Sequence, residues 1–156
     1  ADIVNTKNKR FSSLEQYEQQ GLYKVGEIAL LSKMTFLENK ASLLPSTIEE
    51  LNQVHTFLER YPNISIELSV HTDARGTAKF NHRLARKRAD AIAQFLLNKG
   101  TPKEQISTVG YGEDKLLNHC SDGIRCSEAE HLQNKRVEMK ITQVNRLKVE
   151  HLIGQR

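Results

Sequence analysis

The segment from Ile64 to Val70 limits the possible folds most strongly, because it alternates apolar and polar residues along its whole length. A period of two residues is typical of a β-strand with one buried face. Apolar residues at helical spacing before this segment, up to Arg60, and after it, from about Asn81 to Asn98, predict a helix on each side. This alternation favours a sheet in which parallel strands are joined by right-handed crossovers.

Three further strands are expected over residues 28–36, 106–109 and 137–141. The second face of the central strand carries serine and glutamate, so we expect only one face of the sheet to be covered. The predicted fold class is therefore α+β, an α/β sandwich with the element order β-α-β-α-β-(α)-β. It has one mixed four-stranded sheet with the helices packed on one face.

The chain of 156 residues has the length of one domain. Residues 1–24 are polar and weakly patterned, apart from a short helix that Gly21 would end, and we interpret them as a linker or N-terminal extension. Residues 25–144 form the expected domain, and residues 145–156 a basic C-terminal tail. Within the domain, Ser46 and Glu49 have the spacing of a capping box at the start of the first long helix.

Composition and charge exclude few functions. No apolar run approaches the roughly 18–20 residues that a membrane span needs, and a net charge of +4 is too mild to identify a partner. Six basic residues lie between Arg75 and Arg88, but Phe80 is the only aromatic residue among them, so we favour a solvated helix face over a nucleic-acid interface. Because neither a nucleophile–base pair nor a zinc triad is recognisable, we expect no enzyme, metal or cofactor.

The chain has two cysteines, Cys120 and Cys126, both in a polar loop over residues 113–129. A disulfide between them would stabilise the fold by only about 2 kcal/mol in the loop-entropy model, and it would indicate an oxidising compartment. Two free thiols, or half of a metal site with His119 or His131 nearby, are the alternatives. We favour the disulfide.

The turn after the central strand carries the charges of greatest interest. Asp73 follows the end of the strand, Gly76 permits a turn, and Arg88 lies in the next helix. Ligands of such sheets bind beyond the carboxyl ends of parallel strands. A carboxylate can bind an ammonium group, and a guanidinium can bind a carboxylate through two parallel hydrogen bonds. The pair therefore suits a zwitterionic ligand, and an internal salt bridge between Asp73 and Arg88 is the alternative.

A signature of His-Thr-Asp, Gly and Asn-x-x-Leu-Ser-x-x-Arg-Ala is matched by His71-Thr72-Asp73, Gly76, Asn81, Leu84 and Arg88-Ala89. In this signature the chain resembles the OmpA-like peptidoglycan-binding domain family, represented by the C-terminal domains of OmpA, MotB and Pal. The later motifs Gly-Tyr-Gly-Glu and Asn-Arg-Arg-Val are matched at residues 110–113 and 134–137. Two positions depart from the family, with Ala85 in place of serine and Lys135 in place of arginine. The resemblance covers residues 28 to 142.

The resemblance implies a non-catalytic domain that binds peptidoglycan through the diaminopimelate of the stem peptide. Such a domain anchors the outer membrane, or an outer-membrane protein, to the cell wall from the periplasmic side. By the same match Asp73 and Arg88 are expected to bind the ligand, with Thr72, Asn81 and Leu84 beside them, Gly76 supplying backbone amides, and Asn39 and Arg136 at the rim.

A protein-interaction module of an envelope complex is the alternative function, and a cell-wall hydrolase a less favoured one. The loop with the two cysteines and the linker-like start are similar to features of multidomain envelope proteins of the Bacteroidetes type.

Overall fold

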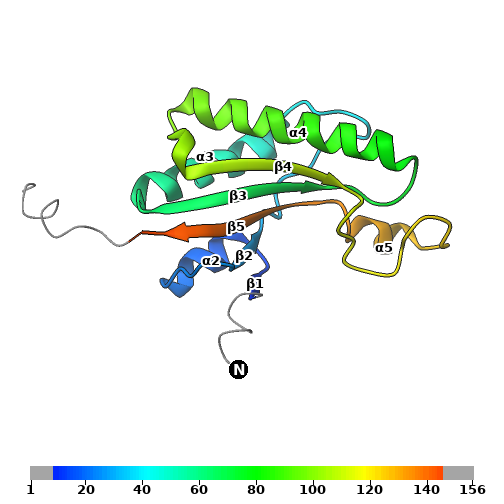
Figure 1. Ribbon diagram of the computed structural model, residues 1–156, viewed down its shortest axis with the longest axis horizontal. Coiled ribbons are helices and arrows are strands. Elements are labelled where there is room, and N and C mark those ends of the chain that lie inside the picture. The colour runs from blue at the N-terminus through cyan, green and yellow to red at the C-terminus, as the bar shows by residue number, and fades with distance from the viewer. Residues whose placement is uncertain (1–8, 146–156) are drawn as a thin grey trace, which may run out of the picture.

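The computed structural model describes residues 9–145, which form a single mixed sheet of five strands. The strands are β1 (Arg10–Phe11), β2 (Ile28–Leu30), β3 (Ile64–His71), β4 (Ile106–Gly112) and β5 (Arg136–Val144), arranged in the order β1-β2-β5-β3-β4 (Figure 1). β3 pairs with β4 in parallel and with β5 in antiparallel fashion. The predicted α+β class is confirmed, and the sheet has one strand more than expected.

The helices are α2 (Leu14–Gln20), α3 (Pro45–Arg60), α4 (Ala78–Lys99) and α5 (Glu128–Leu132), with a 3-10 turn η1 (Lys103–Gln105) before β4. α4 lies along β4 and β3 (Figure 1). It begins at Ala78, three residues earlier than predicted, because the hydroxyl of Thr77 accepts a hydrogen bond from the backbone N–H of Phe80 and caps the helix. Among the helices in the described part of the chain, none has the length and apolarity that crossing a bilayer requires.

The capping box predicted at Ser46 and Glu49 does not form. The helix begins one residue before it, at Pro45, and the N-cap residue Leu44 makes no side-chain hydrogen bond. Proline suits the first helical position because the N–H that it lacks has no intrahelical partner there. A complete capping box is found instead at α5, between Ser127 and Glu130.

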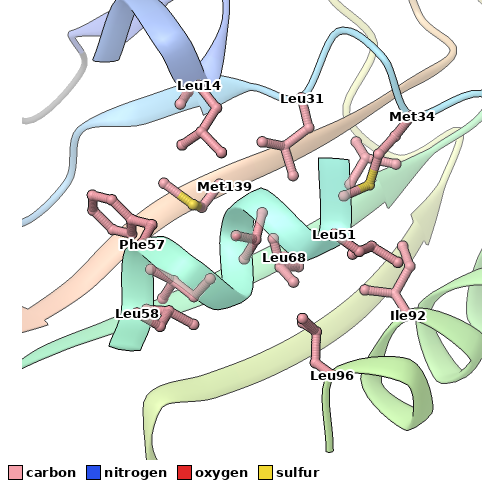
Figure 2. Close-up of a cluster of buried hydrophobic side chains, with 14 of the residues drawn as sticks. Leu14, Leu31, Met34, Leu51, Phe57, Leu58, Leu68, Ile92, Leu96 and Met139 are labelled. Atoms are coloured by element: carbon pink, nitrogen blue, oxygen red, sulfur yellow. The ribbon is translucent and has the colours of Figure 1, made fainter. Parts of the chain in front are cut away.

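One hydrophobic core lies between the sheet and the helices (Figure 2). α3 and α4 contribute to it from one side, and β3 and β5 from the other. The largest fully buried side chains of these four elements are Leu51, Phe57, Leu58, Ile64, Ile66, Leu68, Ile92, Leu96 and Met139. Their burial follows the helical and two-residue periods of the sequence, so the side of the sheet that faces the helices is the predicted one.

Part of the predicted linker belongs to this packed unit. β1 pairs in parallel with β2, and Leu14 and Tyr17 of α2 are buried in the core. The Tyr17 hydroxyl also donates a hydrogen bond of 2.9 Å to a carboxylate oxygen of Glu27. The packed domain therefore starts at about Arg10, because β1 belongs to the sheet and two side chains of α2 are buried in the core. Residues 1–8 and 146–156, which include most of the predicted tail, lie outside the described residues.

The first predicted strand is much shorter than expected, since β2 ends at Leu30 rather than near residue 36. A turn follows at once, with the backbone N–H of Met34 bonded to the carbonyl of Leu31. The remaining residues, up to Leu44, form an irregular loop between β2 and α3. This loop later supplies one wall of the candidate site.

Two glycines allow α4 to approach β4 closely. A Cβ atom at Gly110 would lie 2.4 Å from the backbone nitrogen of Arg86, which no side chain permits. At Gly112 the φ angle is +61° and a Cβ atom would lie 2.9 Å from the backbone nitrogen of His82. The Gly-Tyr-Gly motif therefore serves helix–strand contact, which holds the first turns of α4 against the end of the sheet.

Candidate ligand-binding site

A cavity of about 560 Å³ opens at the carboxyl end of β3, between the loop after β2 and the first turns of α4. All of the residues that the sequence predicts as ligand contacts line it: Asn39, Thr72, Asp73, Gly76, Asn81, Leu84, Arg88 and Arg136. They come from four separate segments of the chain. The fold thus gathers the predicted set in one place, although its members differ greatly in how they are bonded.

Arg88 is a nearly buried cation, with 8% of its surface exposed. Its Nε donates a hydrogen bond of 2.7 Å to the carbonyl of Lys40, and its Nη2 one of 3.1 Å to the carbonyl of Leu37. The guanidinium carbon lies 4.7 Å from the centre of the Phe36 ring. Within residues 9–145 no carboxylate forms an ion pair with Arg88. Burial lowers the pKa of Arg88, as expected for a charge held away from water.

Asp73 has a different environment, because it is already paired with Arg75. Oδ1 accepts the backbone N–H of Arg75 at 2.8 Å, and Oδ2 accepts Nε at 3.2 Å and Nη2 at 2.8 Å. Lys135 Nζ lies 3.7 Å from Oδ2. Burial alone would raise the pKa of Asp73, but the hydrogen bonds from Arg75 outweigh it and hold the pKa below its ordinary value. The alternative of an Asp73–Arg88 salt bridge is therefore not what the structure contains.

Asn81 and Thr72 fix the turn that carries Asp73. The amide group of Asn81 donates to the carbonyls of Asp73, at 3.2 Å, and Arg75, at 3.0 Å, and to Glu113 Oε1 at 3.1 Å. The hydroxyl of Thr72 donates to the carbonyl of Asp73 at 2.9 Å. Both side chains line the cavity, but their hydrogen bonds are spent on the protein itself. Their evident role is to hold the turn in shape.

Gly76 and Asn39 shape the rim through their backbones. Gly76 has φ +87° in the turn after Asp73. Asn39 is the single non-glycine residue with positive φ (+58°) in the described chain, a conformation that asparagine tolerates better than most residues. Leu84 lies half-buried on the cavity side of α4.

Arg136 also lines the cavity, yet it is committed to the protein. Its Nε donates to Glu138 Oε2 at 2.8 Å, while its Nη atoms donate to the carbonyls of Asn134, at 2.9 Å, and Lys115, at 2.8 Å. Burial lowers the pKa of Arg136, and the hydrogen bond to Glu138 acts against that shift. These three short hydrogen bonds are typical of a guanidinium with a structural role rather than of one that binds a ligand.

Sequence reasoning did not predict three residues that matter in this cavity. The sequence groups Arg75 with the basic helix face, does not predict Lys135 as a contact, and predicts Phe36 in a strand. All three line the cavity. The spacing of Arg75 two residues after Asp73 was the available signal, because a turn brings such neighbours together.

Comparison with known proteins places the chain in a family. The model of the OmpA family matches residues 35–129, which is more than half of the chain. The chain belongs to the OmpA family. The peptidoglycan-associated lipoprotein of Legionella pneumophila is 32% identical to it over 103 residues, 66% of this chain and 56% of that protein. The corresponding lipoprotein of Buchnera aphidicola is 42% identical over 71 residues, 46% of this chain and 41% of that protein. This OmpA-family chain thus spans about half the length of the curated relatives it matches.

Solved structures of other cell-envelope proteins have a similar fold. The crystal structure of the peptidoglycan-associated lipoprotein from Burkholderia pseudomallei superposes with a TM-score of 0.61 at 27% identity, covering 72% of this chain and 92% of that one. The cell wall anchor of the type VI secretion system (T6SS) from Pseudomonas aeruginosa gives a TM-score of 0.59 at 18% identity, covering 74% and 79%. The second likeness concerns the fold alone. The similarity to Bacteroidetes-type multidomain proteins stays a prediction.

Proposed function

We propose that this OmpA-family domain binds peptidoglycan non-covalently through the diaminopimelate of the stem peptide. It would thereby anchor the outer membrane, or an outer-membrane protein, to the cell wall on the periplasmic side. The names of the relatives support the peptidoglycan part, since the Legionella and Buchnera proteins are both peptidoglycan-associated lipoproteins. The diaminopimelate part is supported by the chemistry of the cavity.

The observation that carries the proposal is the unpaired charge of Arg88. Removing a guanidinium from water is costly, and a carbonyl or an aromatic face compensates less than an opposite charge does. Within the described chain Arg88 has only the carbonyls of Lys40 and Leu37 and the ring of Phe36. A ligand carboxylate in the cavity would supply the missing counter-ion. Such a charge-assisted contact is worth roughly 1.5–3 kcal/mol.

The two charges should contribute unequally. The distal carbon of diaminopimelate in a stem peptide carries an ammonium and a carboxylate, which match Asp73 and Arg88. An ammonium approaching Asp73 must share the carboxylate with Arg75 and meets the positive charge of Lys135 nearby. A carboxylate approaching Arg88 meets no such competitor. Arg88 therefore provides most of the binding free energy, and Asp73 mainly selects and orients the ligand.

A catalytic function is not supported by the one serine–histidine contact near the cavity. His71 Nε2 lies 2.9 Å from Ser69 Oγ, and the same nitrogen lies 3.7 Å from Glu138 Oε1. A catalytic triad requires the serine and the carboxylate on opposite ring nitrogens. Both side chains are also buried, and burial lowers the pKa of His71 to about 4, so it is a poor base. We therefore propose binding without hydrolysis.

Weak single sites suffice for this function. The cell wall repeats its stem peptide many times, and a protein held in or on a membrane presents many copies to it. Linked binding events of this kind gain avidity without any new contact. A dissociation constant between micromolar and millimolar for one site, about −4 to −8 kcal/mol, is thus compatible with a stable tether.

The decisive experiment removes either side of the Arg88 contact. Arg88→Ala should weaken binding to a diaminopimelate-containing muropeptide by about 10- to 150-fold, the equivalent of one charge-assisted contact. A muropeptide with lysine in place of diaminopimelate lacks only the distal carboxylate. It should therefore bind the unaltered protein as weakly as the diaminopimelate muropeptide binds Arg88→Ala. Calorimetric titration measures both.

The matched control is Arg86→Ala, since Arg86 is exposed on the same helix and does not line the cavity. It should bind like the unaltered protein, and circular dichroism should show that both variants fold. A folded Arg88→Ala variant that still distinguishes the two muropeptides would overturn the assignment of the carboxylate to Arg88.

A further inference from the structure

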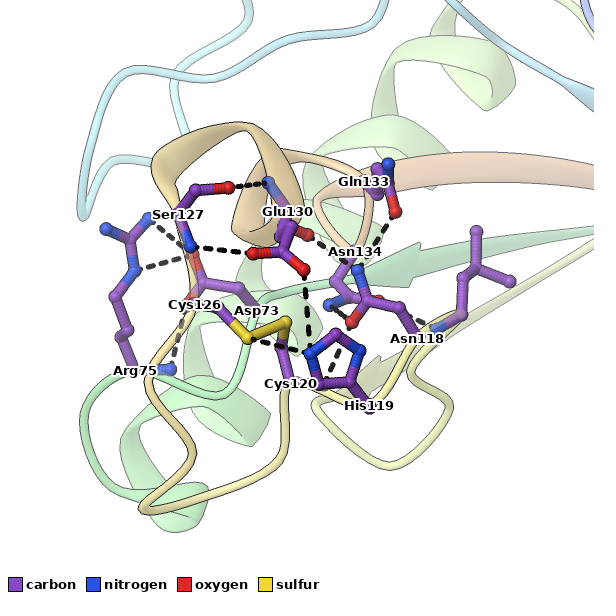
Figure 3. The surroundings of a disulfide bond; sticks show 11 residues. Asp73, Arg75, Asn118, His119, Cys120, Cys126, Ser127, Glu130, Gln133 and Asn134 are labelled. Carbon is purple, nitrogen blue, oxygen red and sulfur yellow. Dashed lines mark hydrogen bonds and ion pairs between the residues drawn. A yellow bond between two sulfur atoms is a disulfide. The ribbon is translucent and has the colours of Figure 1, made fainter.

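A cluster of metal-ligating groups lies between β4 and β5, where Figure 3 shows the disulfide of Cys120 and Cys126. The ligand atoms of His119, Cys120, Cys126 and Glu130 all lie within 4.8 Å of one another. His119 Nε2 is 3.8 Å from Cys126 Sγ and 3.5 Å from Glu130 Oε2. The predicted disulfide is thus present. A histidine and a glutamate lie beside it, and closing the loop requires neither of them.

We propose that the dithiol form of this loop is a Zn²⁺ site, with Cys120, Cys126, His119 and Glu130 as its four ligands. Two thiolates, an imidazole and a carboxylate are all ordinary zinc ligands, and four of them fill a tetrahedral shell. Soft thiolates favour zinc over magnesium or calcium, which prefer oxygen ligands. The disulfide form cannot bind zinc in this way, because its sulfurs are bonded to each other.

The redox step is ordinary thiol–disulfide exchange with a dithiol reductant. The bond between the two sulfurs breaks, each sulfur gains one electron and one proton, and the reductant becomes a disulfide. Zn²⁺ then displaces the two protons as the thiolates bind it. The balance requires no other co-reactant. In the reverse exchange, the disulfide form of the reductant takes the two electrons back, the bond between Cys120 and Cys126 forms again, and the ion is released.

The loop does not depend on the disulfide alone to hold these residues together. Asn118 donates from its amide group to the carbonyl of Glu130 at 2.8 Å and to Gln133 Oε1 at 3.0 Å. Its own amide oxygen accepts the backbone N–H of Cys120 at 3.1 Å and the amide of Asn134 at 2.8 Å. These hydrogen bonds join the Cys120 side of the loop to the end of α5 (Figure 3). None of them involves a sulfur atom, so breaking the sulfur–sulfur bond removes none of them directly.

Glu130 and His119 are both available to an ion. One carboxylate oxygen of Glu130 accepts the backbone N–H of Ser127 at 2.9 Å in the capping box, which fixes the side chain and leaves the other oxygen facing His119. The side chain of His119 is 67% exposed, so an ion can reach its Nε2 from solvent. The ligands thus have an entry path and a fixed carboxylate, two features that a real site requires.

The test uses Co²⁺ as a spectroscopic substitute for Zn²⁺. The chain is reduced with dithiothreitol, which is then removed without air, and is titrated with Co²⁺ beside the untreated disulfide form. The reduced protein should bind one equivalent and show the thiolate-to-cobalt and intense visible bands of a four-coordinate site. One equivalent of Zn²⁺ should abolish these bands. The disulfide form should show neither band.

Variants separate a site from two reactive thiols. His119→Ala and Glu130→Gln should each weaken Zn²⁺ binding by at least about tenfold, since even the loss of an outer partner costs that much. His82→Ala is the control, because His82 is an exposed histidine outside the cluster that also faces a carboxylate, that of Asp114. It should leave the affinity unchanged. Circular dichroism of the reduced form checks that the fold survives.

Three results would overturn the proposal. They are a reduced, folded protein without the four-coordinate cobalt spectrum, equal Co²⁺ binding by both redox forms, and unchanged Zn²⁺ affinity in the His119→Ala and Glu130→Gln variants. A thiol-alkylation assay gives an independent reading. Bound Zn²⁺ should slow the alkylation of Cys120 and Cys126 in the reduced protein, and unchanged rates would also contradict the site.

Discussion

Arg88 and Arg136 face the same cavity and are equally buried, with 8% of each residue exposed, yet their bonding partners differ. Arg136 has a carboxylate partner in Glu138 at 2.8 Å, and two carbonyls accept its remaining donors. Arg88 has two carbonyls and an aromatic ring but no carboxylate in the described chain. The same chemical group is thus a structural cation at one wall and an unmatched charge at the other.

A binding residue can be recognised among several buried charged residues by the counter-ion that the protein does not supply. Lining a cavity does not distinguish the two arginines, and neither does burial. The distinguishing feature is whether the protein itself supplies the counter-ion. Arg136 is predicted to matter for stability and Arg88 for binding, and each of the following predictions tests one side of that contrast.

The largest expected effect is on stability when Arg136 is removed. Arg136→Ala removes one of the two arginines that pair with the buried Glu138, and breaking a buried pair costs about 3–5 kcal/mol. The lower end is expected because Arg10 also pairs with Glu138. Urea unfolding of this variant beside Arg88→Ala measures the contrast. A loss of stability that is larger in Arg88→Ala would reverse the assignment of roles.

The second effect is a pH dependence of the free energy of unfolding, and it arises from His71, which lies near Arg136. Burial, followed by the charge of Arg136, lowers the pKa of His71 from 6.5 to about 4. Between pH 6.5 and 4, His71 is therefore protonated in the unfolded chain but stays neutral in the folded chain. Stability is complete above that pH and falls by about 3 kcal/mol in total as the pH drops to 4. Urea unfolding between pH 7 and 4 measures this decline.

His71→Phe should remove that contribution, because phenylalanine keeps the contact with Tyr111 and cannot titrate. Its unfolding free energy should depend less on pH between 6.5 and 4 than that of the unaltered protein. Arg88→Ala should keep the full dependence. Identical pH profiles for His71→Phe and the unaltered protein would show that His71 is not held neutral by its surroundings.

The smallest effect concerns the aromatic support of Arg88. Phe36→Leu keeps an apolar side chain of similar reach but removes the ring below the guanidinium. A cation–π contact is worth about 0.5 kcal/mol at an exposed site and about 2 kcal/mol when desolvated, so muropeptide affinity should fall by roughly two- to thirtyfold. Calorimetric titration would detect this change. An unaltered affinity would mean that the two carbonyls alone orient Arg88.

The parts of the fold that could be predicted are those with a strong period. β3 alternates over its full length, and α3 and α4 repeat their apolar residues at helical spacing. β1 could not be predicted, because a strand of two residues is defined by its pairing with β2 and carries no pattern of its own. β2 was predicted too long for a related reason, since apolar residues of the following loop continue its pattern.

The candidate site was predictable in its members but not in its bonding. The motif match names Asp73 and Arg88, but it does not show that Arg75, two residues after Asp73, pairs with that carboxylate. The pair of Arg136 and Glu138 was more accessible to prediction. The two residues are separated by two positions in one strand, so their side chains share a face.

The contrast between the two arginines can be followed at both residues at once as ligand is added. In nuclear magnetic resonance spectra, the Nε–H signals of Arg88 and Arg136 are recorded during titration with meso-diaminopimelate, with Arg88→Ala and Arg136→Ala used to assign them. If Arg88 binds the ligand carboxylate, its signal should shift in a saturable way while that of Arg136 stays nearly constant. A saturable shift confined to Arg136, or none at either residue while the ligand binds, would mean that Arg88 does not bind this carboxylate.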